Sequence, residues 1–167
     1  MRMKVAIVYY SFSGNTQNVC EFIMNKLNKE GIATSPIVLK PKRETRSFFN
    51  QGWLAFLRRE VELLNIENIK TLSEYDFVIV ASPVWAFTIT PAMRSYLNKA
   101  QGLKGKKCAV LLTAGGIKGA GRALEEFVSL IKGMEGEVVF KKVLVGKQTK
   151  DKEYLEEELK YLFEAVY

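Results

Sequence analysis

Short apolar runs of strand length alternate with helical patterns along most of this 167-residue chain. The runs predict strands, and the apolar spacing between them predicts helices at 15–30, 90–100, 121–132 and 151–167. The five predicted strands are 4–10, 33–40, 76–82, 107–113 and 137–145. Nearly continuous apolar strands are typical of a parallel sheet covered by helices on both faces. We therefore predict one α/β domain over residues 1–167, a three-layer, doubly wound, five-stranded parallel sheet. Pro36 weakens the second strand and places it at a sheet edge.

The composition is that of an ordinary globular protein, with 48% hydrophobic and 26% charged residues. No apolar run approaches the roughly 18 residues that a membrane-spanning helix needs. The first apolar run follows Met1–Lys4 directly and no small-residue cleavage site comes after it, which favours a strand over a signal peptide. We expect a cytoplasmic protein without membrane insertion.

The chain has no histidine and two cysteines. The first fact excludes histidine-dependent triads, histidine-ligated zinc and haem with a histidine ligand. Cys20 lies in a helical pattern and Cys108 begins a strand pattern, so both are expected to be buried small hydrophobes. No metal site and no catalytic side chain is predicted, and any redox chemistry is expected to come from a bound cofactor.

One long connection, residues 42–72, departs from the alternation. Its aromatic and aliphatic residues from Phe48 to Leu64 predict an amphipathic helix. That helix is expected to pack on the core; its alternative role is to cover a cofactor or meet a partner, and it is a weak hint of an oligomer. The net charge of +7 is concentrated from Lys40 to Arg59, where six basic residues stand against Glu44 alone. A solvated basic face is favoured there over a nucleic-acid site.

The loop after the first strand predicts a phosphate site. It offers three hydroxyls, an amide and a glycine, directly before a helix whose N-terminal N–H groups and dipole favour an anion. A simple helix cap would need one such residue, and here there are four. The loop is Ser11, Phe12, Ser13, Gly14, Asn15 and Thr16. It lacks the Gly-Lys-Ser/Thr ending of nucleoside triphosphate loops, the Gly-x-Gly-x-x-Gly dinucleotide pattern, and a Cys followed by Arg.

Two further loops are expected at the same edge of the sheet, because ligands of such sheets bind beyond the carboxyl ends of the strands. The loop after the third strand carries Trp85 and Phe87, which suggests a flat ligand; in the alternative, these rings fold back onto the next helix. The loop after the fourth strand runs from Thr113 to Gly121, and its small residues let a ligand approach the backbone. Together the loops predict a ligand with a phosphate at one end and a flat ring at the other.

The sequence resembles the flavodoxin family, in its non-classical branch. Residues 11–16 are similar to the family pattern Ser/Thr-x-Ser/Thr-Gly-Asn-Thr, and the 82–85 run with Pro91 downstream is similar to the second flavin loop of that branch. The resemblance covers essentially the whole chain. It implies a flavodoxin-like fold with strand order 2-1-3-4-5 and FMN as cofactor.

The resemblance also assigns roles by position. Ser11, Phe12, Ser13, Gly14, Asn15 and Thr16 would bind the FMN phosphate. Pro83, Val84, Trp85, Ala86 and Phe87 would flank the isoalloxazine ring, and Thr113, Ala114, Gly115 and Gly116 would close over its other edge.

Two redox functions follow from this assignment. The first is an electron carrier of flavodoxin type that works with a redox partner protein. The alternative is an FMN-dependent NAD(P)H oxidoreductase acting on a quinone or a similar acceptor, with the basic stretch attracting the nicotinamide cofactor. The basic charge departs from typical flavodoxins, which are acidic. A binding module without redox activity remains a third possibility.

Overall fold

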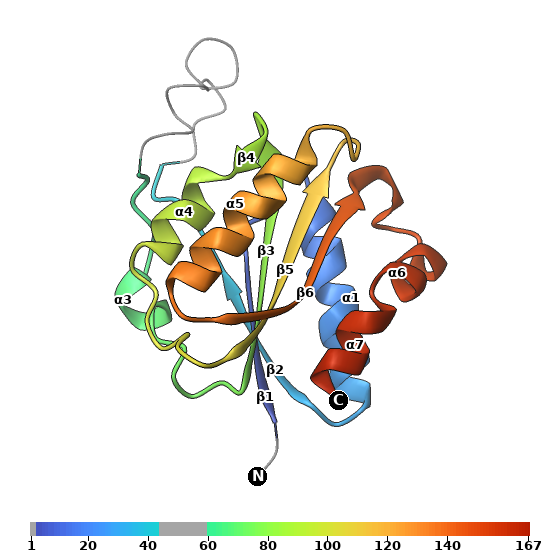
Figure 1. Ribbon diagram of the computed structural model, residues 1–167, viewed down its shortest axis with the longest axis horizontal. Helices are drawn as coiled ribbons and strands as arrows, with labels where there is room; N and C mark the ends of the chain where they lie inside the picture. The colour runs from blue at the N-terminus through green and yellow to red at the C-terminus, as the bar shows by residue number, and fades with distance from the viewer. Residues whose placement is uncertain (1–2, 44–59) are drawn as a thin grey trace.

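Five parallel strands form the centre of the fold, with helices on both sides (Figure 1). The computed structural model describes residues 3–43 and 60–167. The strand order is β2-β1-β3-β5-β6, which is the order 2-1-3-4-5 when the parallel strands alone are counted. The fold-class prediction is therefore confirmed. The strands are β1 (Lys4–Tyr9), β2 (Ala33–Val38), β3 (Phe77–Trp85), β5 (Lys107–Ala114) and β6 (Glu137–Val145), and a short β4 (Thr88–Ile89) pairs antiparallel with the end of β3.

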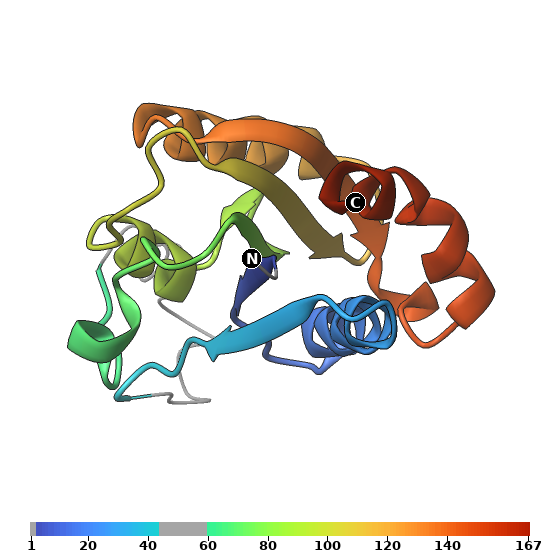
Figure 2. The ribbon, with the colours of Figure 1, turned by 90° about the horizontal axis from the view of Figure 1, so that it is seen from below.

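The helices make two outer layers. Figure 2 shows α4 and α5 on one side of the sheet, with α1 and the C-terminal helices on the other. The elements are α1 (Asn15–Lys29), α3 (Ile66–Ile69), α4 (Pro91–Leu97), α5 (Ala120–Gly133), the 3-10 turn η2 (Gly146–Gln148), α6 (Lys152–Glu158) and α7 (Lys160–Val166). Of the helices in the described ranges, none combines the length and the hydrophobicity that crossing a bilayer requires.

The buried strands divide their side chains between two cores, as the period of two requires. In β1, Val5 and Ile7 pack with α1, α6 and α7, whereas Ala6 and Val8 pack with α4 and α5. All four side chains are fully buried. Because both faces of β1 are covered, its sequence reads as a continuous apolar run, and the pattern located it correctly.

Pro36 lies in β2, which pairs with β1 alone and stands at the edge of the sheet. An edge strand tolerates a proline because one side of it needs no ladder hydrogen bonds, so this prediction is confirmed. Cys20 and Cys108 are free thiols and both are buried, as expected. Burial raises the pKa of the Cys108 thiol to about 12, and it raises that of Cys20 as well.

The described residues differ from the prediction in two of the expected helices. The expected closing helix over 151–167 is two helices, α6 and α7, which meet at Leu159, where the backbone leaves helical geometry at φ −103° and ψ 4°. The expected helix from Phe48 to Leu64 falls mostly on residues 44–59, outside the described ranges, and its described end is not helical. There, Leu63 forms an antiparallel bridge with Pro41 and is buried.

Candidate functional site

The three predicted loops come together at the carboxyl edge of the sheet. The register pairs Tyr9 of β1 with Ala81 of β3, and Pro83 of β3 with Thr113 of β5, so the strands end side by side. The first loop leads into α1: Ser11, Phe12 and Ser13 precede the helix, Gly14 is its N-cap, and its first turn begins with Asn15 and Thr16. In the second loop, β3 ends with Pro83, Val84 and Trp85, and a turn of Ala86 and Phe87 follows. In the third loop, β5 ends with Thr113 and Ala114, and Gly115 and Gly116 follow it.

The first loop leaves backbone donors available at the start of α1. Gly14 has φ +91°, a conformation that glycine adopts without steric cost. The Ser11 hydroxyl accepts a hydrogen bond from the Gln17 N–H at 3.1 Å, and the Gly14 carbonyl accepts one from the Asn18 N–H at 2.9 Å. The helix itself offers no partner to the N–H groups of Gly14, Asn15 and Thr16. The first turn also has no acidic residue to compete with an anion.

A buried hydrogen bond joins the first loop to the third. The hydroxyls of Thr16 and Thr113 lie 2.8 Å apart, and either can be the donor. Both side chains are almost completely buried. A hydroxyl donates one hydrogen bond and accepts two, so this pair still has capacity for a ligand oxygen. The contact fixes the start of α1 against the end of β5.

A fourth strand end, which the sequence reasoning missed, supports the same loop. The Thr149 hydroxyl donates to the Gly146 carbonyl at 2.9 Å and lies 3.4 Å from Oδ1 of Asn15. A Cβ atom on Gly146 would come within 2.7 Å of Nδ2 of Asn15, so a larger residue here would displace the Asn15 side chain. The signal was available, because these residues follow β6 and the rule on strand ends applies to β6 too.

The predicted loop after the third strand is in part a β-hairpin. The third strand extends to Trp85, and Val84 and Trp85 pair with Ile89 and Thr88 in an antiparallel hairpin. Its two-residue turn, Ala86 and Phe87, has φ +47° and +62°. Such turns favour Asn-Gly, and a residue with a Cβ costs about 1–3 kcal/mol in this backbone region. The turn is strained, so its surroundings must hold it.

Aromatic contacts connect this hairpin with its neighbours. The Trp85 ring meets Phe12 edge-to-face at 5.7 Å between centroids and Tyr10 in the same way at 5.8 Å. On the other side, the Phe87 ring lies against Gly119 so closely that a Cβ there would come within 2.5 Å of it. The rings therefore do not fold back onto α4 alone; they bridge the first and third loops.

Each of the three loops exposes one large apolar side chain. Phe12 is 42% exposed, Phe87 is 63% exposed and Ile117 is 68% exposed. Cβ atoms added to Gly115 or Gly116 would meet nothing within 4 Å. Apolar side chains and open glycine backbone at one edge are typical of a surface that takes an apolar ligand.

A polar network connects the hairpin to α4 and α5. Nη2 of Arg94 in α4 donates to the Thr88 hydroxyl at 2.8 Å and to Glu126 of α5, and the Thr88 hydroxyl donates to the other oxygen of Glu126. Arg94 and Glu126 are 25% and 29% exposed. Sequence reasoning missed these residues because they come from separate elements and form no local motif.

These residues fit the FMN that the resemblance implies. The start of α1 offers N–H donors and hydroxyls without a cation, which suits a phosphate. The exposed apolar side chains and aromatic rings at the same edge suit a flat ring system. In the described ranges, no cluster of three or more metal-ligating side chains is present.

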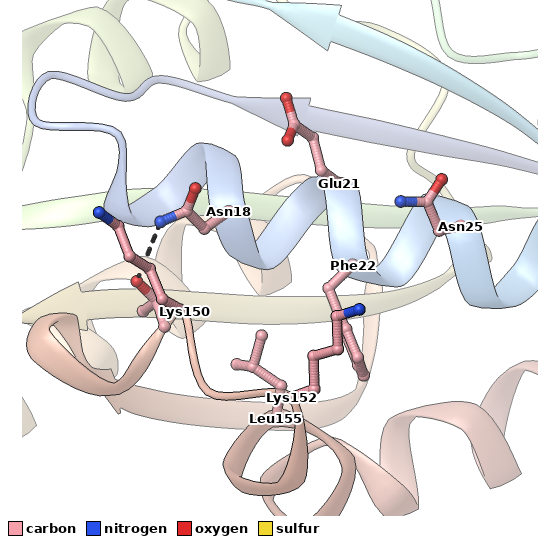
Figure 3. A pocket seen from close by; sticks show the side chains of 8 residues that line it. Asn18, Glu21, Phe22, Asn25, Lys150, Lys152 and Leu155 are labelled. Atoms are coloured by element: carbon pink, nitrogen blue, oxygen red, sulfur yellow. Dashed lines mark hydrogen bonds between the residues drawn. The ribbon is translucent and has the colours of Figure 1, made fainter.

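A separate groove lies on the α1 side of the molecule (Figure 3). It has a volume of about 320 Å³, and Asn18, Phe22, Lys152 and Leu155 are among the residues that line it. The groove lies next to Thr149, whose hydroxyl is near Asn15 of the first loop, and the Asn18 amide lies 3.5 Å from that hydroxyl. None of the residues predicted to contact FMN lines this groove.

The family described as NADPH-dependent FMN reductase matches residues 3–150. A search among curated proteins finds no relative of this chain. Among solved structures, an NADH:FMN oxidoreductase in its apo form is similar at 15% identity and a TM-score of 0.69, covering 99% of this chain and 90% of the other. A flavodoxin from the domain Archaea is 19% identical, with a TM-score of 0.65 and coverages of 98% and 99%. The two-electron reduced flavodoxin of Megasphaera elsdenii is 16% identical, with a TM-score of 0.61 and coverages of 93% and 98%. At such identities the likeness shows the fold.

Proposed function

The chain belongs to the NADPH-dependent FMN reductase family, and on that premise we propose that it is an oxidoreductase that takes electrons from NADPH or NADH through bound FMN. The protein is a flavodoxin-like, FMN-binding redox protein. The observation that carries the proposal is the joining of three loops at one sheet edge, by the Thr16–Thr113 hydrogen bond and the Phe12–Trp85 contact.

The phosphate of FMN is assigned to the start of α1. The N–H groups of Gly14, Asn15 and Thr16 would hold its oxygens, together with the hydroxyls of Ser11 and Ser13. Thr149 and Gly146 would keep Asn15 in place.

The flavin ring is assigned to the apolar edge between the hairpin and the third loop. Pro83, Val84, Trp85, Ala86 and Phe87 would flank it on one side, and Thr113, Ala114, Gly115 and Gly116 on the other. FMN supplies the reversible redox chemistry, and the chain's part is to bind the ring, orient it and shield it from water.

The nicotinamide cofactor would approach the same edge. Lys118 is an exposed neighbour of Gly119, and Arg122 is an exposed residue in the first turn of α5. Both cations are within three residues of Gly119 in the sequence, and Gly119 lies against the Phe87 ring of the strained turn. They would attract the phosphates of an anionic dinucleotide.

An electron carrier with a protein partner is the second candidate. The observation that favours it is the lack of a recognisable acid, base or nucleophile among the residues assigned to the site. Flavin chemistry with a nicotinamide does not require such a group, so this observation does not decide between the two functions. We expect either reaction to take place in the cytoplasm.

An anaerobic titration of the FMN-loaded protein separates the two candidates. The proposed enzyme loses its flavin absorption on addition of NADPH or NADH and recovers it with a quinone. A carrier is not reduced by either nicotinamide, but is reduced when a partner reductase is added. Protein that takes up no FMN contradicts both functions.

Ser13→Ala tests the phosphate assignment, with Ser35→Ala in the edge strand β2 as the matched control. Losing a hydrogen bond to a charged group costs about 1.5–3 kcal/mol, so FMN affinity should fall roughly 10- to 150-fold. Riboflavin lacks the phosphate, and its affinity should not change. Equal losses for the two flavins would contradict the assignment.

A further inference from the structure

The strained turn beside the proposed flavin ring is held by side chains from three elements. Thr88 follows the turn directly in β4. Its hydroxyl donates to Glu126 of α5 and accepts from Nη2 of Arg94 in α4 at 2.8 Å. Arg94 and Glu126 also pair with each other. The hydroxyl therefore stands at the centre of a closed network that fixes β4 to both helices of that layer (Figure 1).

The network retains a feature that stability alone does not explain. Nε of Arg94 is buried and has no hydrogen-bond partner among residues 3–43 and 60–167. A buried donor without a partner costs free energy, and a charged pair in partly buried surroundings is weak support for a fold. The arrangement is better explained by what it holds in place, because positive φ angles at Ala86 and Phe87 persist only where the surroundings impose them.

Trp85 directly precedes the strained turn and Phe87 is its second residue, and the rings of both reach the other loops. Trp85 contacts Phe12 of the first loop, and Phe87 lies on Gly119 of the third. Thr88 is paired with Trp85 across the hairpin. A displacement of Thr88 would therefore move both rings relative to the edge where the flavin is assigned.

We propose that Arg94 and Glu126 are positioning residues that act through Thr88 to hold the Trp85–Phe87 turn ready for the flavin ring. This inference rests on the proposed function, because it places the ring at that turn. Neither residue needs to touch the flavin. Because the turn is already ordered before binding, it loses no conformational entropy when the flavin ring binds. The network therefore contributes to affinity for the ring and not for the phosphate.

The test uses Thr88→Val, which keeps the shape and removes both hydrogen bonds, and Glu126→Gln, which removes the charge. Thr88→Ser is the conservative variant that restores the hydroxyl. Glu125→Gln is the matched control, because Glu125 is the next residue on α5 and pairs with Lys141 on the surface. Binding of FMN and of riboflavin is measured for each, with the fluorescence of the bound flavin.

In Thr88→Val and Glu126→Gln, both flavins should bind about tenfold more weakly, by the same factor, and the bound flavin should be less quenched. Thr88→Ser and Glu125→Gln should match the wild type. A variant that is merely destabilised would bind less flavin per mole of protein, with unchanged affinity and quenching, which would overturn the proposal.

Two other results have distinct meanings. If the wild type binds FMN and Thr88→Val binds and quenches it equally, the positioning role is wrong and the proposed function stands. If FMN affinity falls while riboflavin affinity does not, the network acts on the phosphate, which also overturns the proposal. A wild type that binds no FMN contradicts the proposed function itself.

Discussion

The buried bond between Thr16 and Thr113 allows a quantitative test of how the first and third loops depend on each other. The two hydroxyls are 2.8 Å apart, and the side chains are 1% and 4% exposed. Water cannot readily replace a lost partner at such burial. Replacing either residue by valine keeps the shape of the side chain and leaves the other hydroxyl buried without its partner.

Each single variant should lose about 1–3 kcal/mol in the free energy of unfolding, which is the desolvation cost of a buried group without a partner. For a chain of this size, each kcal/mol corresponds to roughly 2–4 °C in the melting temperature. The double variant Thr16→Val/Thr113→Val removes both polar groups together. Its loss should be much smaller than the sum of the single losses, giving a coupling energy of about 1–3 kcal/mol.

The measurement is urea denaturation of the flavin-free protein, with four proteins in one cycle. An unchanged dependence on urea concentration shows that the variants unfold in the same way. Thr34→Val is the control, because the exposed Thr34 hydroxyl bonds to Asn28 at 3.0 Å and water can replace that partner. It should change the stability by less than about 0.5 kcal/mol. Additive losses in the cycle would refute the dependence of one hydroxyl on the other.

Two further predictions concern glycine and cysteine positions. Gly119→Ala should weaken FMN binding, because the added Cβ would strike the Phe87 ring. Gly105→Ala is the control and should leave binding unchanged. Both glycines have positive φ, but a Cβ at Gly105 meets nothing within 4 Å. Binding titrations check this, and equal affinities would contradict it. Burial raises the pKa of the Cys108 thiol to about 12 and also raises the pKa of Cys20. Both thiols should therefore resist iodoacetamide at pH 8 and react only after unfolding. Mass spectrometry counts the adducts, and labelling of the folded protein would contradict the prediction.

The central strands could be predicted from sequence because a strand that is buried on both faces has a continuous run of apolar residues. In β5, Ala109 and Leu111 pack towards one helical layer, and Val110 and Leu112 pack towards the other. Every position from Cys108 to Leu112 is apolar, so the run stands out from its surroundings. The loop that we propose for the phosphate could be recognised for a similar reason, since its polar residues and glycine follow such a run directly.

The hairpin could not be predicted, because it depends on contacts between elements. Strand β4 has only two residues, and the turn residues Ala86 and Phe87 are not those that favour positive φ. Arg94 and Glu126 lie 32 positions apart and form a pair only after α4 and α5 have packed. No local pattern records such a pair.

The break between α6 and α7 at Leu159 could not be predicted from the sequence for a different reason. Leu155, Leu159 and Leu162 are all buried at helical spacing, so the apolar pattern continues through the point where the two helices meet. Periodicity reports which side chains face the core, and it does not report a local change of backbone angle. Residue spacing alone therefore predicted one helix.

The support of Asn15 by Thr149 spans 134 positions of the chain. During synthesis, the first loop and α1 leave the ribosome long before the residue that holds Asn15 in place. Contacts so distant in sequence are made late, because a long loop must be closed to form them. The proposed phosphate site would thus reach its final form only once residue 149 has emerged and β6 has joined the sheet. FMN would then act as a selective stabiliser of the completed fold, since a ligand that binds only the native state adds to its stability.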